Sequence, residues 1–465
     1  MEAVSIREIM EAVGGHLLGT YDDLSATITH VCRDSRQMEE GALYIPLIGE
    51  RFDGHAYINA ALEAGAAGCF TARERESYLP GKFYIKVDST QKALRDLARW
   101  YKKRFDIPCV AVTGSVGKTT TKDMVAAVLG EKYKVLKTEG NYNNEVGLPL
   151  TLLRLNSSHQ VAVLEMGMNH FGEIDYLTKI VEPEVALITN VGDSHIENLG
   201  SRENILKAKC EIFHGMGENG LAILNGDDEL LRGLEGKLPM PVLWCGTGEG
   251  CQYRASDISG VDELSCRIST PAHTFSCVIP SPGTHMVYPA LMAAAVGEHF
   301  GLTQEQIIQG LLHFAPTKMR MNIMHRGDDI TILNDTYNAN PQSMRAAVDV
   351  LAKYHNTHRV AVLGDMLELG ALAPALHEGV GEFLGRSGVE CLVAVGELAV
   401  HIYEAAKAAM VNEIYYCPTK EEAKAVLAQV AQPHSTILVK ASRGMAFEEL
   451  VDELVRLTPE VGESV

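Results

Sequence analysis

At 465 residues the chain is longer than one hydrophobic core usually serves, and its length predicts about three domains. Hydrophobic residues make up 46% and charged residues 22%, an ordinary globular balance that excludes a largely disordered chain. The 41 Lys and Arg residues against 60 Asp and Glu residues give a net charge of −19. This charge argues against broad binding to nucleic acids or anionic membranes, because phosphate contacts need clustered cations, but it allows a phosphorylated small molecule in a local basic pocket.

The cysteines and the first residues of the chain predict a soluble cytoplasmic protein. The ten cysteines are scattered and form no Cys-x-x-Cys pair, so we expect reduced thiols rather than a disulfide frame or a zinc site. The opening MEAVSIREIMEAVGG has an amphipathic helical pattern and lacks the continuous apolar stretch of a signal peptide. No stretch approaches ~18 uninterrupted apolar residues, so we expect no membrane insertion.

The chain divides by its pattern into regions 1–105, 106–316 and 317–465. The first mixes short strand-like runs with helices: a strand at 41–47, a helix at 56–66 and a longer helix at 91–104. The Pro-bearing polar stretch APTKMRMN marks the second boundary, after a helical pattern at 302–314.

The second and third regions both predict parallel sheets covered by helices. CVAVTG, VAVLEMG and VALITNVG are apolar runs with polar residues at their carboxyl ends, and a helix is expected at 119–129. In the third region the runs ITILND, RVAVLGD, ECLVAVG and STILVKAS alternate with helices. In such doubly wound sheets the carboxyl ends of the strands carry the functional site.

The strongest local signal is the segment TGSVGKTT, residues 113–120. Its glycines let backbone N–H groups converge on phosphate oxygens at a helix N-terminus, Lys118 can neutralise β- and γ-phosphates, and the Thr119 hydroxyl can ligate Mg²⁺. The alternative is a glycine turn followed by a Thr cap, and Val112 stands where the usual first glycine would be. The strand before and the helix after favour phosphate binding by Gly114, Ser115, Val116, Gly117, Lys118, Thr119 and Thr120.

Two further candidates follow apolar strands. Glu165 comes directly after VAVL, where a Mg²⁺ ligand belongs beside a phosphate loop, although a helix cap or a solvated turn acid is the alternative. His195 follows the next strand and could serve as a metal ligand or general base, or could be structural.

Other polar segments have ordinary structural alternatives. Lys207 and Lys209 lie in a helical pattern and look like a solvated helix face. Asn141, Asn143 and Asn144 suit either a structural turn or contacts to a polar ligand. The stretch NDTYNANP, 334–341, predicts either a capped turn or the facing wall of an active site, and Arg320 could reach a phosphate or remain solvated.

Together these segments resemble the Mur ligase family, the ATP-dependent amide-forming enzymes of peptidoglycan precursor synthesis. The matching motifs are TGSVGKTT, the loop 141–144, EMGMNHFGEI, TNVGDSHIENLGS, KAKCEIF and NDTYNANPQSM. In the first region Asp34, Ser35 and Arg36, followed by GALYIPLIGERFDGHAYINAALEAGAAG, resemble a UDP-sugar-binding domain of that family. The resemblance covers nearly the whole chain.

The resemblance implies an α/β fold of three domains: a UDP-muramoyl-peptide-binding domain (1–105), a central P-loop ATPase domain with a parallel sheet (106–316) and a Rossmann-like C-terminal lid (317–465). NDTYNANPQSM and VLGDMLELG favour the member that joins D-alanyl-D-alanine to UDP-N-acetylmuramoyl-tripeptide. That reaction consumes ATP, passes through an acyl phosphate and yields ADP and phosphate. We expect a monomer. The third residue of the tripeptide, meso-diaminopimelate or lysine, stays open.

The resemblance also assigns roles. Lys118, His195 and Lys209 would be catalytic, with Lys209 carbamylated. Two Mg²⁺ ions would be held by Thr119, Glu165, His195 and the carbamate. ATP would contact the phosphate loop, Arg320, Asp335 and Asn338. Substrate would contact Asp34, Ser35, Arg36, Asn141, Asn143, Asn144, Tyr337 and Asn340.

One departure from the family pattern affects adenine binding. The family usually carries asparagines in HNVxNALAA, and this chain has Met286 and Pro289 at those positions, which puts the usual adenine contact in doubt. Three other functions remain as alternatives: a sibling ligase that adds a diamino acid to UDP-N-acetylmuramoyl-dipeptide, folylpolyglutamate synthetase, and a nucleotide-regulated binding protein. The Asp34–Arg36 segment disfavours folylpolyglutamate synthetase.

Overall fold

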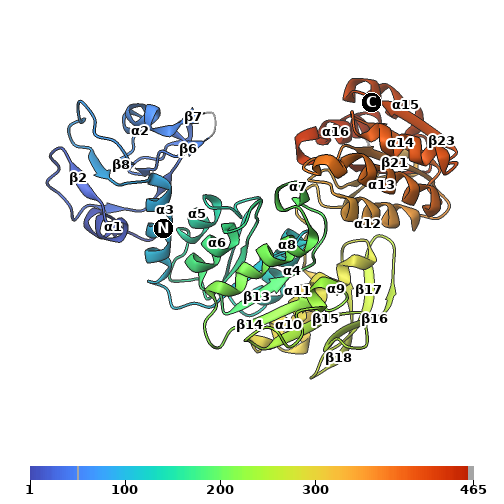
Figure 1. Ribbon diagram of the computed structural model, residues 1–465, viewed down its shortest axis with the longest axis horizontal. Helices are drawn as coiled ribbons and strands as arrows, with labels where there is room; N and C mark the ends of the chain where they lie inside the picture. Colours follow the sequence, from blue (N-terminus) through green and yellow to red (C-terminus); the bar gives the residue numbers. More distant parts are fainter. Residues whose placement is uncertain (50–51, 459–465) are drawn as a thin grey trace.

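The computed structural model describes residues 1–49 and 52–458, and three large sheets follow one another along this part of the chain. Figure 1 shows the N-terminal and C-terminal regions at opposite ends of the central region. Residues 50, 51 and 459–465, which belong to the predicted first and third regions, lie outside the described residues. The limits predicted at 105 and 316 stay a prediction.

The N-terminal region is built on a sheet with strand order β2-β9-β8-β5-β4. Its strands are β2 (His16–Leu18), β4 (Val31–Cys32), β5 (Leu43–Tyr44), β8 (Gly68–Thr71) and β9 (Phe83–Lys86). Two separate antiparallel pairs lie beside it in the chain: β1 (Val4–Ser5) pairs with β3 (Thr27–Ile28), and β6 (Ile48–Gly49) pairs with β7 (Phe52–Asp53). Its helices are α1 (Ile6–Val13), α2 (Ile58–Glu63) and α3 (Thr90–Lys102). The helix expected at 56–66 is a 3-10 turn, Gly54–Tyr57, followed by the shorter α2.

Helix α3 joins the N-terminal region to the central one. The hydroxyl of Tyr101 donates to the carbonyl of Leu155 at 2.7 Å and accepts from the backbone N–H of Glu2 at 2.7 Å. One hydrophobic core therefore continues from the first sheet into one face of the central sheet.

The central sheet has the order β11-β12-β10-β13-β14-β15-β16-β17-β18. Its parallel strands are β10 (Cys109–Thr113), β11 (Val135–Lys137), β12 (Val161–Glu165), β13 (Val185–Ile188), β14 (Leu221–Asn225) and β15 (Val242–Gly246). The helices are α4 (Lys118–Gly130), α5 (Gly147–Leu152), α6 (Glu173–Val181), α7 (Ile196–Leu199), α8 (Arg202–Cys210), α9 (Glu229–Arg232), α10 (Val287–His299) and α11 (Gln304–Leu312). Buried residues of α4, α10 and α11 cover one face, and those of α5, α6 and α8 cover the other.

An antiparallel extension of this sheet was not expected from the sequence. After β15 the chain forms β16 (Tyr253–Ser259), which lies parallel to β15, and then β17 (Leu264–Ser269) and β18 (Thr274–Ile279), which are antiparallel. Their buried and exposed residues alternate, the pattern of strands with one solvated face. The central domain is therefore a mixed sheet with a parallel core.

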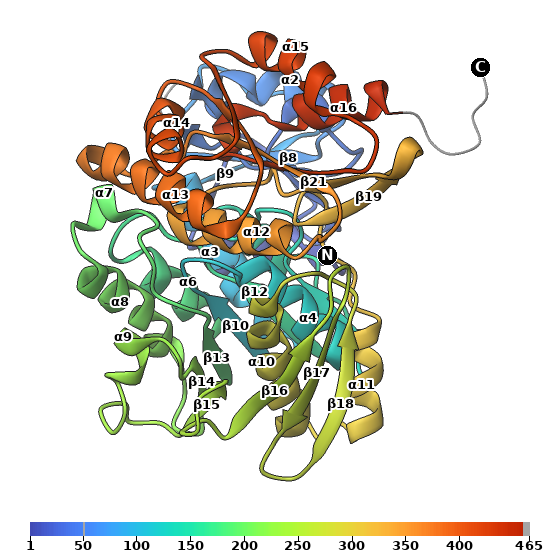
Figure 2. The same ribbon diagram turned by 90° about the vertical axis from the view of Figure 1, so that its right-hand side faces the viewer.

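The C-terminal sheet has the order β19-β20-β24-β21-β22-β23, and only β19 is antiparallel to its neighbour among the described strands. The strands are β19 (Asn322–Arg326), β20 (Ile330–Asn334), β21 (His358–Gly364), β22 (Cys391–Val395), β23 (Glu413–Cys417) and β24 (Ser435–Lys440). The helices are α12 (Pro341–Ala352), α13 (Ala373–Ser387), α14 (Ala399–Ala408), α15 (Lys420–Val430) and α16 (Glu448–Leu457). Helix α12 lies on the side of this region nearest the central region, as Figure 2 shows.

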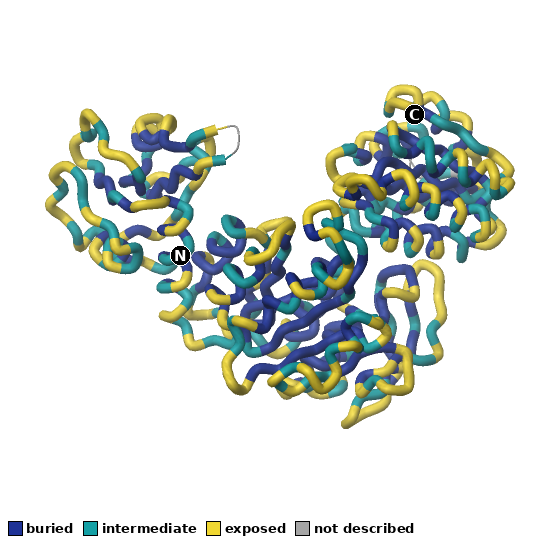
Figure 3. The backbone as a smooth tube through the Cα atoms, in the orientation of Figure 1, coloured by how far each residue is buried: buried dark blue, intermediate teal, exposed yellow. Residues whose placement is uncertain are grey.

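The buried residues lie mainly on the sheets and on the helix faces that cover them. Figure 3 shows buried backbone in the interior of each region and exposed backbone at the outer turns. Within the described part of the chain, no helix is both long and apolar enough to cross a membrane. All ten cysteines are free, which agrees with the thiols expected from their spacing.

Candidate active site

A cavity of about 1080 Å³ lies between the central and C-terminal regions. It is lined by the turn after β10, by the carboxyl ends of β12 and β13, and by residues around the start of α12. The carboxyl ends of parallel strands from both sheets therefore contribute to one cavity, as expected for doubly wound sheets.

The turn between β10 and α4 has the backbone of a phosphate loop. Gly114 has φ 151° and Gly117 has φ 81°, conformations that favour glycine. A Cβ on Gly114 would lie 1.8 Å from the hydroxyl oxygen of Thr189, so the loop also needs glycine there for space. Asn190 holds the loop by accepting from the N–H of Val116 at 2.9 Å. Residues 115–121 line the cavity at the start of α4.

Lys118 is the first residue of α4, and its Nζ donates to the carbonyl of Gly114 at 2.8 Å. Burial lowers the pKa of the Lys118 ammonium, Glu165 raises it, and Arg320 lowers it again. The cation thus lies where an anionic ligand would stabilise it.

Glu165 ends β12 beside the loop and is 2% exposed. Its Oε1 accepts from Nδ2 of Asn143 at 2.7 Å, while its Oε2 is buried and has no hydrogen-bond partner among the described residues. A buried carboxylate oxygen without a donor is costly unless a ligand completes it. This oxygen is suited to a cation.

His195 begins the turn into α7 and has φ 63°. Its Nδ1 lies 3.0 Å from Oε2 of Glu368, which comes from the C-terminal region. The nearby His195 is the main reason why the pKa of Glu368 is lowered. His195 lines the same cavity as Thr119 and Glu165.

Arg320 brings the C-terminal region to the phosphate loop. Its Nη2 donates to the hydroxyl of Thr119 at 3.1 Å, and its guanidinium lies 4.0 Å from the ring centroid of Tyr337. Its Nε is buried and lacks a hydrogen-bond partner within residues 1–49 and 52–458. The aromatic ring fixes the guanidinium against the loop, and one donor is left for a ligand.

Lys440 is a site residue that the sequence analysis missed. It ends β24, is 2% exposed, and donates to Oδ2 of Asp335 at 2.5 Å and to the carbonyl of Asn338 at 2.8 Å. Burial lowers the pKa of Lys440, and Asp335 opposes this effect. Its place at the carboxyl end of STILVK, beside the strand ITILN, was the available signal.

Asn340 connects the two regions. Its Oδ1 accepts from the N–H of Ser343 and so caps α12, while its Nδ2 donates to the hydroxyl of Ser194 at 2.9 Å. Asn338 is exposed, and its Oδ1 accepts from the N–H of Arg443. The NDTYNANP segment therefore serves both as a helix cap and as a wall of the cavity.

Comparisons with known proteins decide the family. Three family models match successive parts of the chain: the Mur ligase family catalytic domain at residues 27–102, the Mur ligase middle domain at 112–297 and the Mur ligase glutamate ligase domain at 319–443. The chain belongs to the Mur ligase family. The resemblance seen in the sequence and the three-domain α/β architecture are confirmed.

Full-length Mur ligases are similar to this one. The UDP-N-acetylmuramoyl-tripeptide–D-alanyl-D-alanine ligase of Bacillus subtilis is 38% identical over 97% of this chain and 98% of its own length. A crystal structure of MurF from Acinetobacter baumannii has a TM-score of 0.90 and 32% identity, covering 98% of this chain and 99% of the other. MurF ligase from Thermotoga maritima in complex with ADP has a TM-score of 0.82 and 28% identity, covering 92% and 97%.

In this Mur ligase, Lys209 is buried and Lys207 is exposed, although both lie in α8. Burial, and then the nearby Lys118, hold the pKa of the Lys209 amine well below its ordinary value. Lys209 is not among the residues that line the cavity within the described chain. The solvated helix face predicted from the pattern alone applies to Lys207 and not to Lys209.

The three asparagines of the loop 141–144 have different surroundings. Asn143 and Asn144 line the cavity, and Asn143 donates to Glu165. Asn144 accepts from the N–H groups of Val146 and Gly147 at the start of α5. Asn141 is exposed and does not line the cavity.

The segment Asp34–Arg36 lies in the N-terminal region and does not line this cavity. Asp34 caps the 3-10 turn Ser35–Gln37, and its carboxylate pairs with Arg36 at 2.7 Å. The hydrogen bond from Arg36 lowers the pKa of Asp34 to about 2. Arg36 is 86% exposed, so its guanidinium is open to solvent.

At the positions where Mur ligases usually have asparagines, Met286 and Pro289 line the cavity. Helix α10 begins at Val287, so Pro289 stands in the first turn, where its missing N–H breaks no helical hydrogen bond. The hydroxyl of Tyr288 donates to Oδ2 of Asp227 at 3.1 Å, and both residues also line the cavity. The sequence analysis missed this pair.

Proposed function

We propose that this Mur ligase joins the amine of D-alanyl-D-alanine to the terminal carboxylate of UDP-N-acetylmuramoyl-tripeptide, with ATP converted to ADP and phosphate. The observation that carries the proposal is the full-length similarity to ligases of that name, over all three regions of the chain. The phosphate loop supports the use of ATP at the cavity, and so do the buried Oε2 of Glu165 and Nε of Arg320, which line the same cavity and lack partners among the described residues.

The chemistry requires activation of the acceptor. An amine cannot displace oxide from a carboxylate, so the carboxylate oxygen first attacks the γ-phosphorus of ATP and ADP leaves. The neutral amine then attacks the carbonyl carbon of the acyl phosphate, phosphate leaves with the former carboxylate oxygen, and the nitrogen loses one proton to solvent. Lys118 and the N–H groups at the start of α4 would bind the β- and γ-phosphates and stabilise the charge that develops during transfer.

The residues at the cavity are suited to magnesium. The free Oε2 of Glu165 is a hard oxygen donor, and Thr119 and His195 line the same space. We propose that these three residues hold Mg²⁺ and that a carbamate on Lys209 completes the site for a second ion. Bound Mg²⁺ would screen the negative charges of the phosphates and of the approaching carboxylate.

Burial supports the carbamate on Lys209. An ammonium buried near Lys118 is unfavourable, so burial and Lys118 lower the pKa of Lys209 and favour the neutral amine. That amine can add to the carbon of CO₂ and release one proton to solvent, which gives an anionic oxygen donor near the cation of Lys118. The exposed Lys207 has no such reason to react.

The C-terminal wall would complete the site. We propose that Arg320 binds the γ-phosphate through the donor that has no protein partner, and that Asp335 and Asn338 lie on the nucleotide side. Tyr337 and Asn340, with Asn143 and Asn144 across the cavity and Asn141 just outside its lining, would contact the peptide and the incoming amine. Closure of this wall would keep water from the acyl phosphate.

The uridine end of the substrate is assigned to the N-terminal region, through Asp34, Ser35 and Arg36. We further propose domain limits at 105 and 316, a monomer, and action in the cytoplasm. The free state of all ten cysteines supports a reducing compartment.

Phosphate release and product mass test the function. The full chain with Mg²⁺ and ATP would receive four mixtures: tripeptide with D-alanyl-D-alanine, each of these alone, and UDP-N-acetylmuramoyl-dipeptide with a diamino acid. We expect phosphate and a condensed product only in the first. Comparable turnover in the fourth would reassign the chain to the sibling activity, and ATP binding without turnover in any mixture would favour a nucleotide-regulated binding protein.

A further inference from the structure

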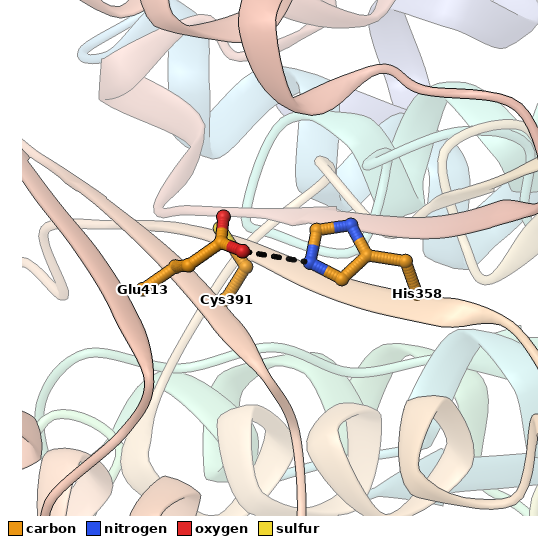
Figure 4. Close-up of side chains that lie close together, drawn as sticks. All are labelled: His358, Cys391 and Glu413. Carbon is orange, nitrogen blue, oxygen red and sulfur yellow. Dashed lines mark ion pairs between the residues drawn. The ribbon is translucent and has the colours of Figure 1, made fainter.

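Three side chains that the proposed reaction does not use meet at the amino end of the C-terminal sheet. His358, Cys391 and Glu413 are the first residues of β21, β22 and β23. One ligand atom from each lies within 4.8 Å of the others. Figure 4 shows the three side chains gathered at this place. The cavity lies at the opposite, carboxyl edge of the same sheet, where Asp335 follows β20 and Lys440 ends β24.

The strand register explains why these residues meet. Val360 pairs with Cys391, and Cys391 pairs with Glu413, across three neighbouring parallel strands. His358 is two residues before Val360 and therefore points to the same face of the sheet. The three ligand atoms therefore lie close enough together for one ion to bridge them.

The hydrogen bonding of the cluster is incomplete. Both ring nitrogens of His358 are buried and have no hydrogen-bond partner among the described residues. Oε1 of Glu413 lies 3.8 Å from Nε2 of His358, too far for a hydrogen bond. Cys391 is buried, and burial raises the pKa of its thiol to about 12. Buried ring nitrogens that lack partners are costly, and a bound cation would satisfy one of the two.

Glu390 and Arg359, next to this cluster, form a pair whose hydrogen bonds are complete, in contrast to the cluster. Glu390 comes directly before Cys391, yet its Oε2 accepts from Nε of Arg359 at 2.9 Å and from the backbone N–H of Arg359 at 3.0 Å. That carboxylate is satisfied. The free ligand atoms therefore belong to His358, Cys391 and Glu413.

We propose that His358, Cys391 and Glu413 bind a divalent transition-metal ion, with Zn²⁺ the best match. Nitrogen, sulfur and oxygen donors of this kind suit Zn²⁺, which bonds at about 2.0–2.3 Å and accepts water as a fourth, tetrahedral ligand. On binding, the thiol of Cys391 loses its proton to solvent as the sulfur–metal bond forms. Glu413 is 49% exposed, which gives the ion a route from solvent.

This ion would tie together the first residues of three neighbouring strands, away from the reaction. The proposal is independent of the proposed ligase function, because it uses none of the residues of the cavity. It also revises the expectation, drawn from the spacing of the cysteines, that the chain has no zinc site. Strand register, and not Cys-x-x-Cys spacing, brings these ligands together.

Cobalt titration tests the site. The full chain would be stripped of metal with a chelator, kept reduced with a non-thiol reagent, and titrated with Co²⁺ in excess Mg²⁺. We expect one equivalent of Co²⁺ to give a near-ultraviolet thiolate-to-cobalt band that Zn²⁺ then removes. Absence of the band in the wild-type chain would overturn the proposal.

Matched variants identify the ligands. Cys391→Ala should abolish the band and leave ligase activity in place. Cys417→Ala is the control, because Cys417 is also buried and lies on β23 on the same face. Retention of the band in Cys391→Ala, or its loss in Cys417→Ala, would contradict the assignment.

A surface variant keeps the test open if Cys391→Ala does not fold. Glu413→Gln changes a half-exposed side chain, and we expect it to weaken Co²⁺ binding by at least about tenfold. Zn²⁺ should also raise the unfolding temperature of the wild-type chain more than that of Glu413→Gln. Equal affinity and equal thermal shifts would remove Glu413 from the site and overturn the three-ligand proposal.

Discussion

The phosphate loop and the Asp34–Arg36 segment both carry charges that a substrate could bind, but they hold them differently. Beside the loop, Glu165 at the end of β12 is 2% exposed and has a carboxylate oxygen without a hydrogen-bond partner among the described residues. At the other segment, Arg36 is 86% exposed and already pairs with Asp34. A buried polar atom without a partner indicates what its ligand must supply, whereas an exposed and satisfied pair gives no such information. The geometry of the buried residues therefore supports the nucleotide site, whereas only the family resemblance supports the sugar site.

Removal of the loop cation should produce the largest effect. We expect Lys118→Ala to lower kcat on the order of 10³-fold, because the phosphates lose their main counter-charge. Affinity for the UDP-sugar, measured by calorimetry, should stay near that of the wild type, because Asp34–Arg36 lies outside the cavity. An equal loss of UDP-sugar affinity would show that the two sites are not separate.

The next largest effect concerns the buried amine. We expect Lys209→Ala to lower turnover on the order of 100-fold, since an anionic metal ligand is lost, and short-chain carboxylates should restore part of it. Bicarbonate depletion should lower wild-type activity reversibly. Lys207→Ala is the control, because Lys207 is exposed on the same helix and should change little. Near-normal turnover of Lys209→Ala would contradict the carbamate.

A substitution of Gly114 tests whether the phosphate loop needs its backbone conformation. Gly114→Ala places a Cβ against Thr189 at φ 151°, so we expect the free energy of unfolding to fall by about 1–3 kcal/mol, with weaker ATP binding. Gly130→Ala, at the other end of α4, meets nothing within 4 Å and serves as the control. Chemical denaturation and nucleotide titration measure both quantities. Equal stability of the two variants would mean that the loop does not need glycine at position 114.

The smallest effect is expected at the exposed pair. Arg36→Ala should raise KM for the UDP-sugar substrate roughly fivefold and leave kcat unchanged, because a solvated guanidinium contributes modestly to binding. Arg456→Ala, which removes another exposed guanidinium paired with a carboxylate, is the control. Steady-state kinetics with the UDP-sugar varied would separate the two constants. A fall in kcat without a change in KM would place Arg36 in the reaction instead.

Local patterns predicted much of this structure. The expected phosphate loop lies between a buried strand and a helix, and the apolar runs at residues 109–113, 161–165 and 435–440 are strands. Strands β16, β17 and β18 were missed because a parallel sheet was predicted for the whole region, and the alternating polar and apolar residues of this segment were not considered.

The rest depended on tertiary packing. Nothing in the helical pattern distinguishes Lys209 from Lys207, because burial of one side of α8 is decided by the elements packed against it. The meeting of Arg320 with Thr119 joins residues about two hundred positions apart, and only the three-dimensional arrangement places them together. Lys440 could have been found, since it ends a strand beside Asp335.

Transfer of an isotope tests the central claim, that the cavity activates the tripeptide carboxylate by phosphorylation. UDP-N-acetylmuramoyl-tripeptide labelled with ¹⁸O in its terminal carboxylate would be incubated with the enzyme, Mg²⁺, ATP and D-alanyl-D-alanine, and the released phosphate analysed by mass spectrometry. Because the carboxylate oxygen that attacks the γ-phosphorus leaves with the phosphate, the account predicts one ¹⁸O in each phosphate released during amide formation. Unlabelled phosphate accompanying the amide product would contradict it.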